Sequence, residues 1–370
     1  MTINRILARI AAWLFRPSKN IPDHIRSFKK ILVIRQHDQL GDMLCVIPLL
    51  RALRKSYPEA RITLITSPVN YRIMEYHPYV NDVICYDKKK YWKSPTMLLQ
   101  LLGYLRKRAF DLAIVPATVS LSTTSDLIAL ISGAPMRIGA ESLNGKDNPC
   151  ADFYTHRVAL SWEEDPHRHQ TIRNMDILKP LGITSDDLSL IIGFTRDEKR
   201  YAENEAASLK GNKTFLVGIH PGAGKPENRW QAEYFAEIAN KLANEKDASV
   251  VVTIGPMDDE PYDLFCRHLQ FRHEVIYKKP IRTVAALISK LDLFITNDTG
   301  IMHIAGATGI NMIALFGKTD PLQWAPIGPN VRYICISDDD VNSISPETVW
   351  MEVEAILAQK LPPTGKQNEQ

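Results

Sequence analysis

After residue 30 the chain alternates short apolar runs, rich in β-branched residues, with longer stretches whose apolar side chains recur at helical spacing. This alternation is typical of parallel α/β units, in which a helix returns the chain between neighbouring strands. In the first half we expect strands over 31–35, 61–66, 82–86, 111–116 and 136–139, and helices over 44–56, 94–108 and 123–132.

The second half repeats this alternation. We expect strands over 214–219, 249–254, 274–277, 292–296, 311–316 and 332–336, and helices over 232–244, 259–269, 283–290 and 300–308. A helical connector over 168–181 and a polar stretch over 182–187 separate the halves, so we expect domains over 30–185 and 186–345. A helix over 346–361 follows, which could pack across both domains, and the chain ends in a tail over 362–370. Such doubly wound parallel sheets bind ligands at the carboxyl ends of their strands.

Composition narrows the class of protein but names no ligand. With 370 residues, 45% of them hydrophobic and 24% charged, the chain is not disordered, collagen-like or a coiled coil. It lacks an apolar run of the roughly 18 residues that a transmembrane helix needs. The five cysteines are odd in number and never spaced C-x-x-C, which favours a reducing, cytoplasmic compartment over disulfides or a zinc site.

Basic charge is concentrated in a leader over 1–29. Apolar residues between 3 and 14 recur there at helical spacing, with arginines between them. The leader is either an amphipathic helix on the anionic cytoplasmic face of the inner membrane or a helix packed on the first domain. The rest of the chain has a net negative charge, so no nucleic-acid partner is expected.

The first candidate site follows the strand over 31–35, where Gly41 and Asp42 precede a helix. Gly41 permits a tight turn between strand and helix. Asp42 is either a helix cap, which is the commoner use of aspartate at such a place, or a carboxylate general base at the edge of the sheet. Pro48 has no amide hydrogen, so it must kink this helix or mark its true start.

A glycine-rich loop, HPGAGKPENRW, follows the first strand of the second half. The backbone amides of Gly222, Ala223 and Gly224 can face a phosphate, and a helix follows them. Lys225 and Arg229 could add positive charge. The spacing matches neither a Walker A loop nor a dinucleotide fingerprint, and a plain turn between strand and helix is the alternative.

The segment NDTGIMH ends the strand over 292–296. Asp298 could accept hydrogen bonds from sugar hydroxyls, while Thr299 and Gly300 could donate to an anion. His303 lies one helical turn later on the same face. The alternative is that Asp298 caps the helix and His303 is a satisfied core residue.

In this order and at these separations, the motifs resemble those of glycosyltransferase family 9, the bacterial heptosyltransferases. The resemblance rests on "GD", "PGA…RW…YFAEIA" and "NDTG…H…LFG" with "TDP" and "W" after it, and more weakly on SGAPMRIG and HRHQTIRNMDILKPLGI. It implies a GT-B-type fold, with two Rossmann-like doubly wound domains facing a cleft. It also implies inverting transfer of heptose from ADP-heptose to the lipopolysaccharide core, with no metal and no other cofactor.

The resemblance implies roles for individual residues, with Asp42 matching the general base. Asp259 or Glu260 lies where family members bind the ribose. Asn228 stands where the family usually has lysine, so Lys225 could supply the phosphate's counter-charge. The donor-binding residues expected on this basis are Gly222, Ala223, Lys225, Asn228, Arg229, Asp259, Glu260, Asp298, Thr299, Gly300 and His303.

The acceptor, a glycolipid or saccharide, has weaker candidates. They are Gly41, Arg35, Lys88 and Lys90, of which the lysines could instead belong to a solvated loop. The acidic run over 338–340 contains the D-x-D pattern of metal-dependent transferases, but we expect a polar turn there.

Two other functions fit the same architecture. One is a sugar-nucleotide epimerase with a GT-B fold, and the other is a non-catalytic subunit that binds nucleotide sugars. A dehydrogenase is disfavoured because the glycine fingerprint is broken and no acidic residue follows about 20 residues later.

Overall fold

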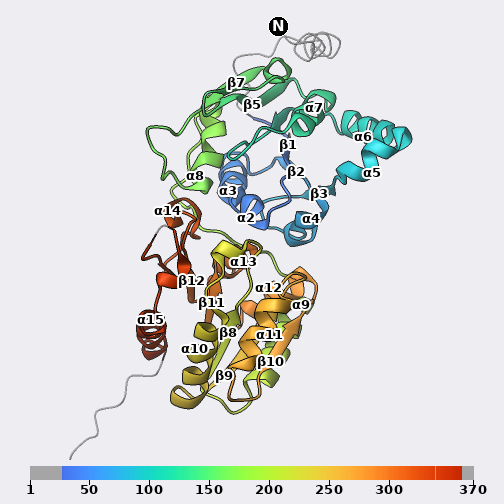
Figure 1. The fold of residues 1–370 in the computed structure, drawn as a ribbon. Coiled ribbons are helices and arrows are strands. Elements are labelled where there is room, and N and C mark those ends of the chain that lie inside the picture. Colours follow the sequence, from blue (N-terminus) through green and yellow to red (C-terminus); the bar gives the residue numbers. More distant parts are fainter. Residues whose placement is uncertain (1–26, 338, 361–370) are drawn as a thin grey trace, which may run out of the picture. The chain divides into compact units, whose positions relative to one another are not determined.

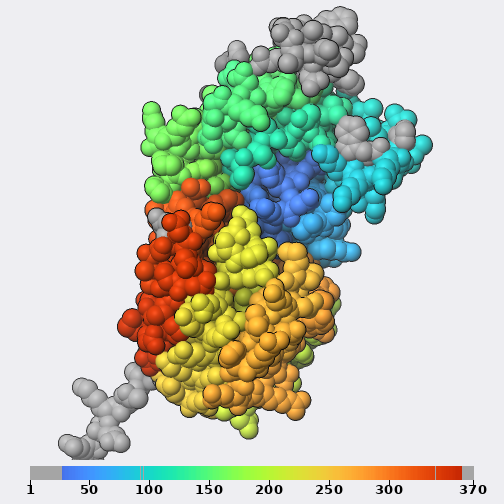
Figure 2. Space-filling view, in the orientation of Figure 1, coloured from blue at the N-terminus to red at the C-terminus, as the bar shows by residue number. Residues whose placement is uncertain are grey.

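We describe a computed structural model of the chain, which covers residues 27–337 and 339–360. The chain divides into two compact units, Met1–Gly193 and Phe194–Gln370. Each unit is one continuous stretch of the chain, coloured from blue to green in the first and from yellow to red in the second (Figure 2). The predicted leader helix and the tail over 362–370 lie outside the described residues.

The described part of the first unit holds a seven-stranded sheet in the order β3-β2-β1-β4-β5, with β6 and β7 both paired to β5 (Figure 1). Only the short β6 runs antiparallel to its described neighbour. The strands are β1 (Lys30–Arg35), β2 (Arg61–Thr66), β3 (Asp82–Cys85), β4 (Leu112–Ile114), β5 (Met136–Leu143), β6 (Lys146–Asp147) and β7 (His156–Leu160).

Helices connect these strands and cover the sheet. They are α2 (Leu40–Leu44), α3 (Ile47–Ser56), α4 (Pro68–Met74), α5 (Lys88–Lys93), α6 (Pro95–Arg108), α7 (Thr123–Ile131) and α8 (Gln170–Met175), with short 3-10 turns at Ala151–Phe153 and Asp176–Leu181. The side chains of β1 from Ile31 to Ile34 are fully buried. A central parallel strand is covered on both faces, which explains its unbroken apolar run.

Arg51 of α3 holds the last segment of the first unit against this helix by hydrogen bonds. Its guanidinium is 2% exposed and donates to the backbone oxygens of Asp187, at 2.7 Å, and Ser189, at 2.8 Å. Nε of Arg51 donates to the hydroxyl of Tyr79 at 3.0 Å. The polar stretch after the connector is therefore packed on the first unit.

The second unit holds a six-stranded parallel sheet in the order β10-β9-β8-β11-β12-β13, which is the strand order of a Rossmann fold. Its strands are β8 (Phe215–His220), β9 (Ala248–Ile254), β10 (Glu274–Tyr277), β11 (Leu293–Asn297), β12 (Met312–Leu315) and β13 (Val331–Ile334). Its helices are α9 (Arg196–Lys210), α10 (Ala232–Glu245), α11 (Asp259–Arg267), α12 (Ile281–Ile288), α13 (Gly300–Thr308), α14 (Pro321–Trp324) and α15 (Pro346–Ala358), with 3-10 turns at Pro226–Asn228 and Val341–Ser343.

The last helix, α15, packs against α10 and β12 of the second unit. Lys246 at the end of α10 donates to Glu354 at 2.6 Å, and its ammonium group also lies over the Trp350 ring at 5.4 Å. Among the described helices, none combines the length and apolar character needed to span a bilayer. The predicted fold class, two doubly wound parallel α/β domains, is confirmed.

Candidate functional site

Asp42 lies in the short helix α2, just after the loop that follows β1 at the carboxyl edge of the first sheet. The N-cap of α2 is Gln39, and its side chain makes no capping bond, so Asp42 is not the helix cap. The Asp42 side chain is 3% exposed and Oδ1 accepts a hydrogen bond from Nη2 of Arg35 at 3.2 Å. A buried carboxylate held by a guanidinium, and not needed as a cap, is suited to a chemical role.

Arg35, the last residue of β1, orients this carboxylate. It is 1% exposed and also donates to the Pro116 carbonyl and the Thr118 hydroxyl, both at 3.1 Å. Burial lowers the pKa of Arg35 and Asp42 opposes this, but an arginine keeps its charge. Oδ2 of Asp42 lies 3.8 Å from Nδ1 of His37, whose pKa is lowered by burial and by Arg35. At neutral pH His37 is therefore mainly uncharged, and Arg35 is the cation that faces Asp42.

The structure brings three of the first-unit predictions together, since Arg35 ends β1 and Gly41 and Asp42 lie in α2, which follows it. Of the two possibilities for Pro48, a kink or a helix start, the structure shows the second, since Pro48 is the second residue of α3. Lys88 and Lys90 lie instead on α5, where both are exposed and Lys90 faces Asp87 at 3.7 Å. Among the described contacts, none joins these two lysines to Asp42.

In the second unit the glycine-rich loop is anchored by Asn297, the last residue of β11. Its amide nitrogen donates to the carbonyls of Pro221, at 3.0 Å, and Gly222, at 3.1 Å. Its oxygen accepts from the Trp230 amide at 3.0 Å. The side chain is fully buried, and sequence reasoning did not single it out, although its position directly before Asp298 was the available signal.

Asn228 joins the second motif to the third. Its amide donates to Oδ2 of Asp298 at 2.9 Å and to the hydroxyl of Thr319 at 3.3 Å. Burial raises the pKa of Asp298, while Thr319 and the charge of Lys225 oppose this. Asn228, which stands where the resemblance leads us to expect lysine, is thus a neutral donor to a carboxylate. The N-cap of α13 is Thr299, so Asp298 is not the cap.

Charged side chains near the loop form two separate pairs. Nε of Arg229 donates to the Ala223 carbonyl at 3.0 Å, and Nη1 approaches Oε2 of Glu260 at 3.4 Å. Asp259 is exposed and contacts Lys278 at 3.2 Å. Two predicted residues, Arg229 and Glu260, are therefore in contact with each other, whereas Asp259 faces a different partner.

The acidic residue that packs against the loop is Asp258, which the sequence analysis did not select. It is 6% exposed, and its Oδ2 accepts from the Gly255 amide at 2.7 Å. Its carboxylate also lies 3.7 Å from Nε2 of His220, and burial lowers the pKa of that histidine. A Cβ added at Gly222 would lie 2.1 Å from Oδ1 of Asp258. Gly222 is therefore needed because the Asp258 carboxylate fills the space beside it.

The remaining donor-site predictions lie at the start of α13 and in nearby loops. Gly300 begins α13, and His303 is 4% exposed with its ring 6.1 Å from the Trp324 ring. Lys225 is exposed. Within residues 27–337 and 339–360, no group of three or more His, Cys, Asp or Glu side chains is arranged to hold a metal ion.

Comparisons with known proteins give the chain a family. The model of glycosyltransferase family 9 (heptosyltransferase) matches residues 98–348, which is more than half of the chain. Lipopolysaccharide heptosyltransferase 3 of Escherichia coli strain K12 is 28% identical over 304 residues, covering 79% of this chain and 83% of that protein.

Solved structures agree with this result. The crystal structure of a family 9 glycosyl transferase from Veillonella parvula superposes with a TM-score of 0.77 at 25% identity, covering 90% of this chain and 98% of that one. The structure of E. coli ADP-heptose lps heptosyltransferase II gives a TM-score of 0.72 at 23% identity, covering 90% and 99%, and supports the GT-B-type fold. The chain belongs to glycosyltransferase family 9 and is a glycosyltransferase.

Proposed function

We propose that the protein transfers heptose from ADP-heptose to a hydroxyl group of a lipopolysaccharide core acceptor, with inversion at the anomeric carbon. The donor and the acceptor class follow from the relatives, whose names specify lipopolysaccharide heptosyltransferases and, in one solved structure, ADP-heptose. The observation that carries the mechanism is the buried Asp42 carboxylate, held by Arg35 and not used as a cap.

In this mechanism Asp42 is the general base. Arg35 occupies Oδ1, so Oδ2 is the oxygen that accepts the proton of the acceptor hydroxyl. The acceptor oxygen then attacks the anomeric carbon, and the bond from that carbon to ADP breaks on the opposite face. A positioned general base contributes about 10²–10⁴-fold to the rate, which corresponds to roughly 3–5 kcal/mol of barrier.

The second unit binds the donor at the loop between β8 and α10. Backbone amides of this loop face the diphosphate, a common arrangement where a strand leads into a helix. Asn297 keeps the loop in place, and the exposed Lys225 supplies positive charge beside Asp298. Asp298, held by Asn228, accepts hydrogen bonds from sugar hydroxyls.

Two further features belong to the proposal. The transfer needs no divalent metal, because the diphosphate's charge is met by the loop amides and by basic side chains. The protein works at the cytoplasmic face of the inner membrane, where the basic leader over 1–29 and the exposed lysines of α5 meet anionic groups.

Replacing Asp42 tests the catalytic step. With ADP-heptose and a delipidated core oligosaccharide, Asp42→Asn lowers kcat about 10²–10⁴-fold. The dissociation constant of ADP for the variant, measured by titration calorimetry, stays within twofold of the wild-type value. The matched control is Asp38→Asn, which replaces an exposed carboxylate in the loop just before α2 and keeps nearly full activity. Comparable turnover by the two variants would contradict the role of Asp42.

The same assay separates the alternatives. An epimerase consumes the donor when no acceptor is present. A non-catalytic subunit binds ADP-heptose, but neither the wild type nor the Asp42→Asn variant turns it over. NMR of the product gives the anomeric configuration, so a retained configuration rules out the inverting step. Activity that disappears in EDTA and returns with added Mg²⁺ rules out the metal-independent step.

A further inference from the structure

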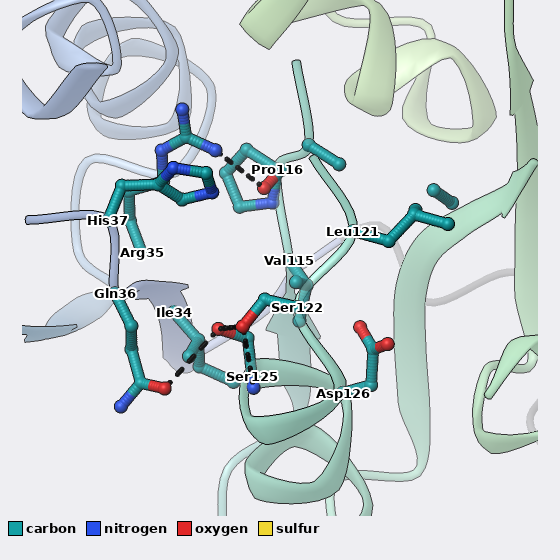
Figure 3. A pocket seen from close by; sticks show the side chains of 12 residues that line it. Ile34, Arg35, Gln36, His37, Val115, Pro116, Leu121, Ser122, Ser125 and Asp126 are labelled. Carbon is teal, nitrogen blue, oxygen red and sulfur yellow. Dashed lines mark hydrogen bonds between the residues drawn. The ribbon is translucent and has the colours of Figure 1, made fainter. Parts of the chain in front are cut away.

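The loop over 36–39 joins Arg35, at the end of β1, to α2, which carries Asp42. The strand-like alternation of side chains continues into this loop, so that Arg35 and His37 project to one side of the chain and Gln36 to the other (Figure 3). Nδ1 of His37 lies 3.8 Å from Oδ2 of Asp42. The position of the Asp42 carboxylate therefore depends on the course of this loop.

The helix α2 cannot hold the loop in place by itself. It has only five residues, and a helix this short is not stable without tertiary contacts. The side chain of its N-cap, Gln39, makes no capping hydrogen bond. The helix packs against α4, which follows β2. The place of Asp42 is therefore set by contacts from neighbouring elements, α4 among them.

Asn70 of α4 supplies such contacts. Its side chain is fully buried, and Nδ2 donates to the carbonyl of His37 at 2.6 Å and to that of Gln39 at 3.3 Å. The hydroxyl of Ser67, the N-cap of α4, donates to the same His37 carbonyl at 3.2 Å. The strands β1 and β2 are parallel neighbours that end at the same edge of the sheet, which explains why the loop after β1 lies beside α4.

The amide oxygen of Asn70 is buried and has no hydrogen-bond partner among the described residues. An unpaired buried polar atom costs free energy, which a leucine of similar size would avoid. Leucine, however, has no donor for the two loop carbonyls. Both described hydrogen bonds of the Asn70 side chain go to the loop, so its amide nitrogen is the part that the fold uses.

The second unit contains a similar arrangement. Nδ2 of Asn297, a fully buried side chain, donates to two successive carbonyls of the glycine-rich loop, those of Pro221 and Gly222. In each unit, one buried amide thus spans two carbonyls of the loop that leads from a central strand to a helix. The two loops are those to which the proposed function assigns the general base and the diphosphate.

We propose that Asn70 is a positioning residue for the transfer reaction. By holding the carbonyls of His37 and Gln39, it keeps the loop and α2 where the Asp42 carboxylate meets the acceptor hydroxyl. Asn70 touches no substrate in this role and acts only through the loop. The inference rests on the proposed function, since it takes Asp42 to be the general base.

A double-mutant cycle with Asn70→Leu and Asp42→Asn tests this role. With ADP-heptose and a delipidated core oligosaccharide, Asn70→Leu lowers kcat about 10–100-fold, because a misplacement of about 1 Å can cost about 10²-fold in rate. The KM for ADP-heptose stays within about twofold, since the donor is assigned to the second unit. In the Asp42→Asn background the same substitution lowers the residual kcat less than about twofold, because the base that it positions is absent.

Asn174→Leu is the matched control. Asn174 of α8 is also fully buried, its Nδ2 donates to the Gln170 carbonyl at 2.8 Å, and its oxygen has no partner among the described residues. None of its described hydrogen bonds reaches the loop over 36–39, so its kcat stays within about twofold of wild type. Calorimetry gives the folded fraction of each variant at the assay temperature, and kcat is expressed per folded molecule.

Ser67→Ala is the second variant, for the case that Asn70→Leu does not fold. It removes only the hydroxyl that shares the His37 carbonyl, so it lowers kcat roughly two- to fivefold, and again only when Asp42 is present. Wild-type kcat in the variant that folds, or an equal loss in both backgrounds, overturns the inference. Failure of the proposed function looks different, because Asp42→Asn alone then keeps wild-type turnover.

Discussion

Gly222 and Gly224 stand two residues apart in the glycine-rich loop, yet the structure predicts opposite outcomes when each is replaced by alanine. At Gly222 a Cβ would lie 2.1 Å from Oδ1, 2.3 Å from Cγ and 2.9 Å from Cβ of Asp258, so the whole side chain must move. At Gly224, which is exposed, the nearest atom is Cε of Met257 at 3.7 Å, an ordinary contact.

The cost at Gly222 follows from what Asp258 would lose. Forcing extra volume into a packed site costs about 1–3 kcal/mol. Moving Asp258 also breaks its 2.7 Å hydrogen bond to the Gly255 amide, and bonds to charged groups are worth about 1.5–3 kcal/mol. Since the loop can relax in part, we expect Gly222→Ala to lower stability by about 2–4 kcal/mol, or the melting temperature of this unit by about 5–15 °C.

Differential scanning calorimetry and ADP titration measure both effects. Gly222→Ala lowers the melting temperature and weakens ADP binding. For Gly224→Ala the melting temperature stays within about 1 °C of wild type and the ADP dissociation constant within about twofold. In an Asp258→Ala background the space is open, so adding Gly222→Ala costs less than about 0.5 kcal/mol more. Equal effects of the two alanines, or full additivity with Asp258→Ala, would refute the steric argument.

Two other predictions concern the first unit. Burial raises the pKa of Asp126 from 3.8 to about 6 in the folded protein, although hydrogen bonds with Tyr154 and Asn148 oppose this. As pH rises, the carboxyl group therefore ionises in the unfolded chain before it ionises in the folded one. Its ionisation thus favours unfolding between about pH 4 and 6. Thermal unfolding across pH should therefore show Asp126→Asn gaining up to about 3 kcal/mol over wild type from pH 4 to 7, and a constant difference would contradict this. Gly139→Ala places a Cβ 2.0 Å from the Tyr154 ring and should lower the free energy of unfolding in urea by about 2–4 kcal/mol. Gly103 is an exposed position of α6 with nothing within 4 Å of an added Cβ, so Gly103→Ala should raise that free energy by about 0.5–1 kcal/mol.

Most of the secondary structure was predictable because it depends on local periodicity. The strands β2 and β10 and the helix α13 have the expected bounds, and the proline in the helix predicted over 44–56 separates α2 from α3. The helix α9 was missed although its capping box, Thr195 with Glu198, is visible in the sequence. The strand β7 was missed because a five-residue run is too short for its periodicity to separate strand from loop.

The site was predictable only in outline. The motifs correctly marked the ends of β1, β8 and β11, because glycines and small polar residues are required where a parallel strand turns into a helix. Asp259 or Glu260 was selected for the nucleoside ribose, and that stays a prediction. The sequence did not show that the neighbouring Asp258 is the carboxylate that packs on Gly222. Neighbouring carboxylates on one turn differ only in which way they face, and spacing does not report that.

The sequence by itself determined the alternation of strands and helices, the two-domain organisation and the three loops that carry the chemistry, since each depends on residues close together in the chain. Only the tertiary structure decided what the polar side chains do. Arg35 reaches Thr118 across 83 positions, and Asn228 reaches Asp298 across 70. Parallel sheets bring the carboxyl ends of distant strands to one edge, so the partners of a buried polar group there are set by strand order, which no local pattern records.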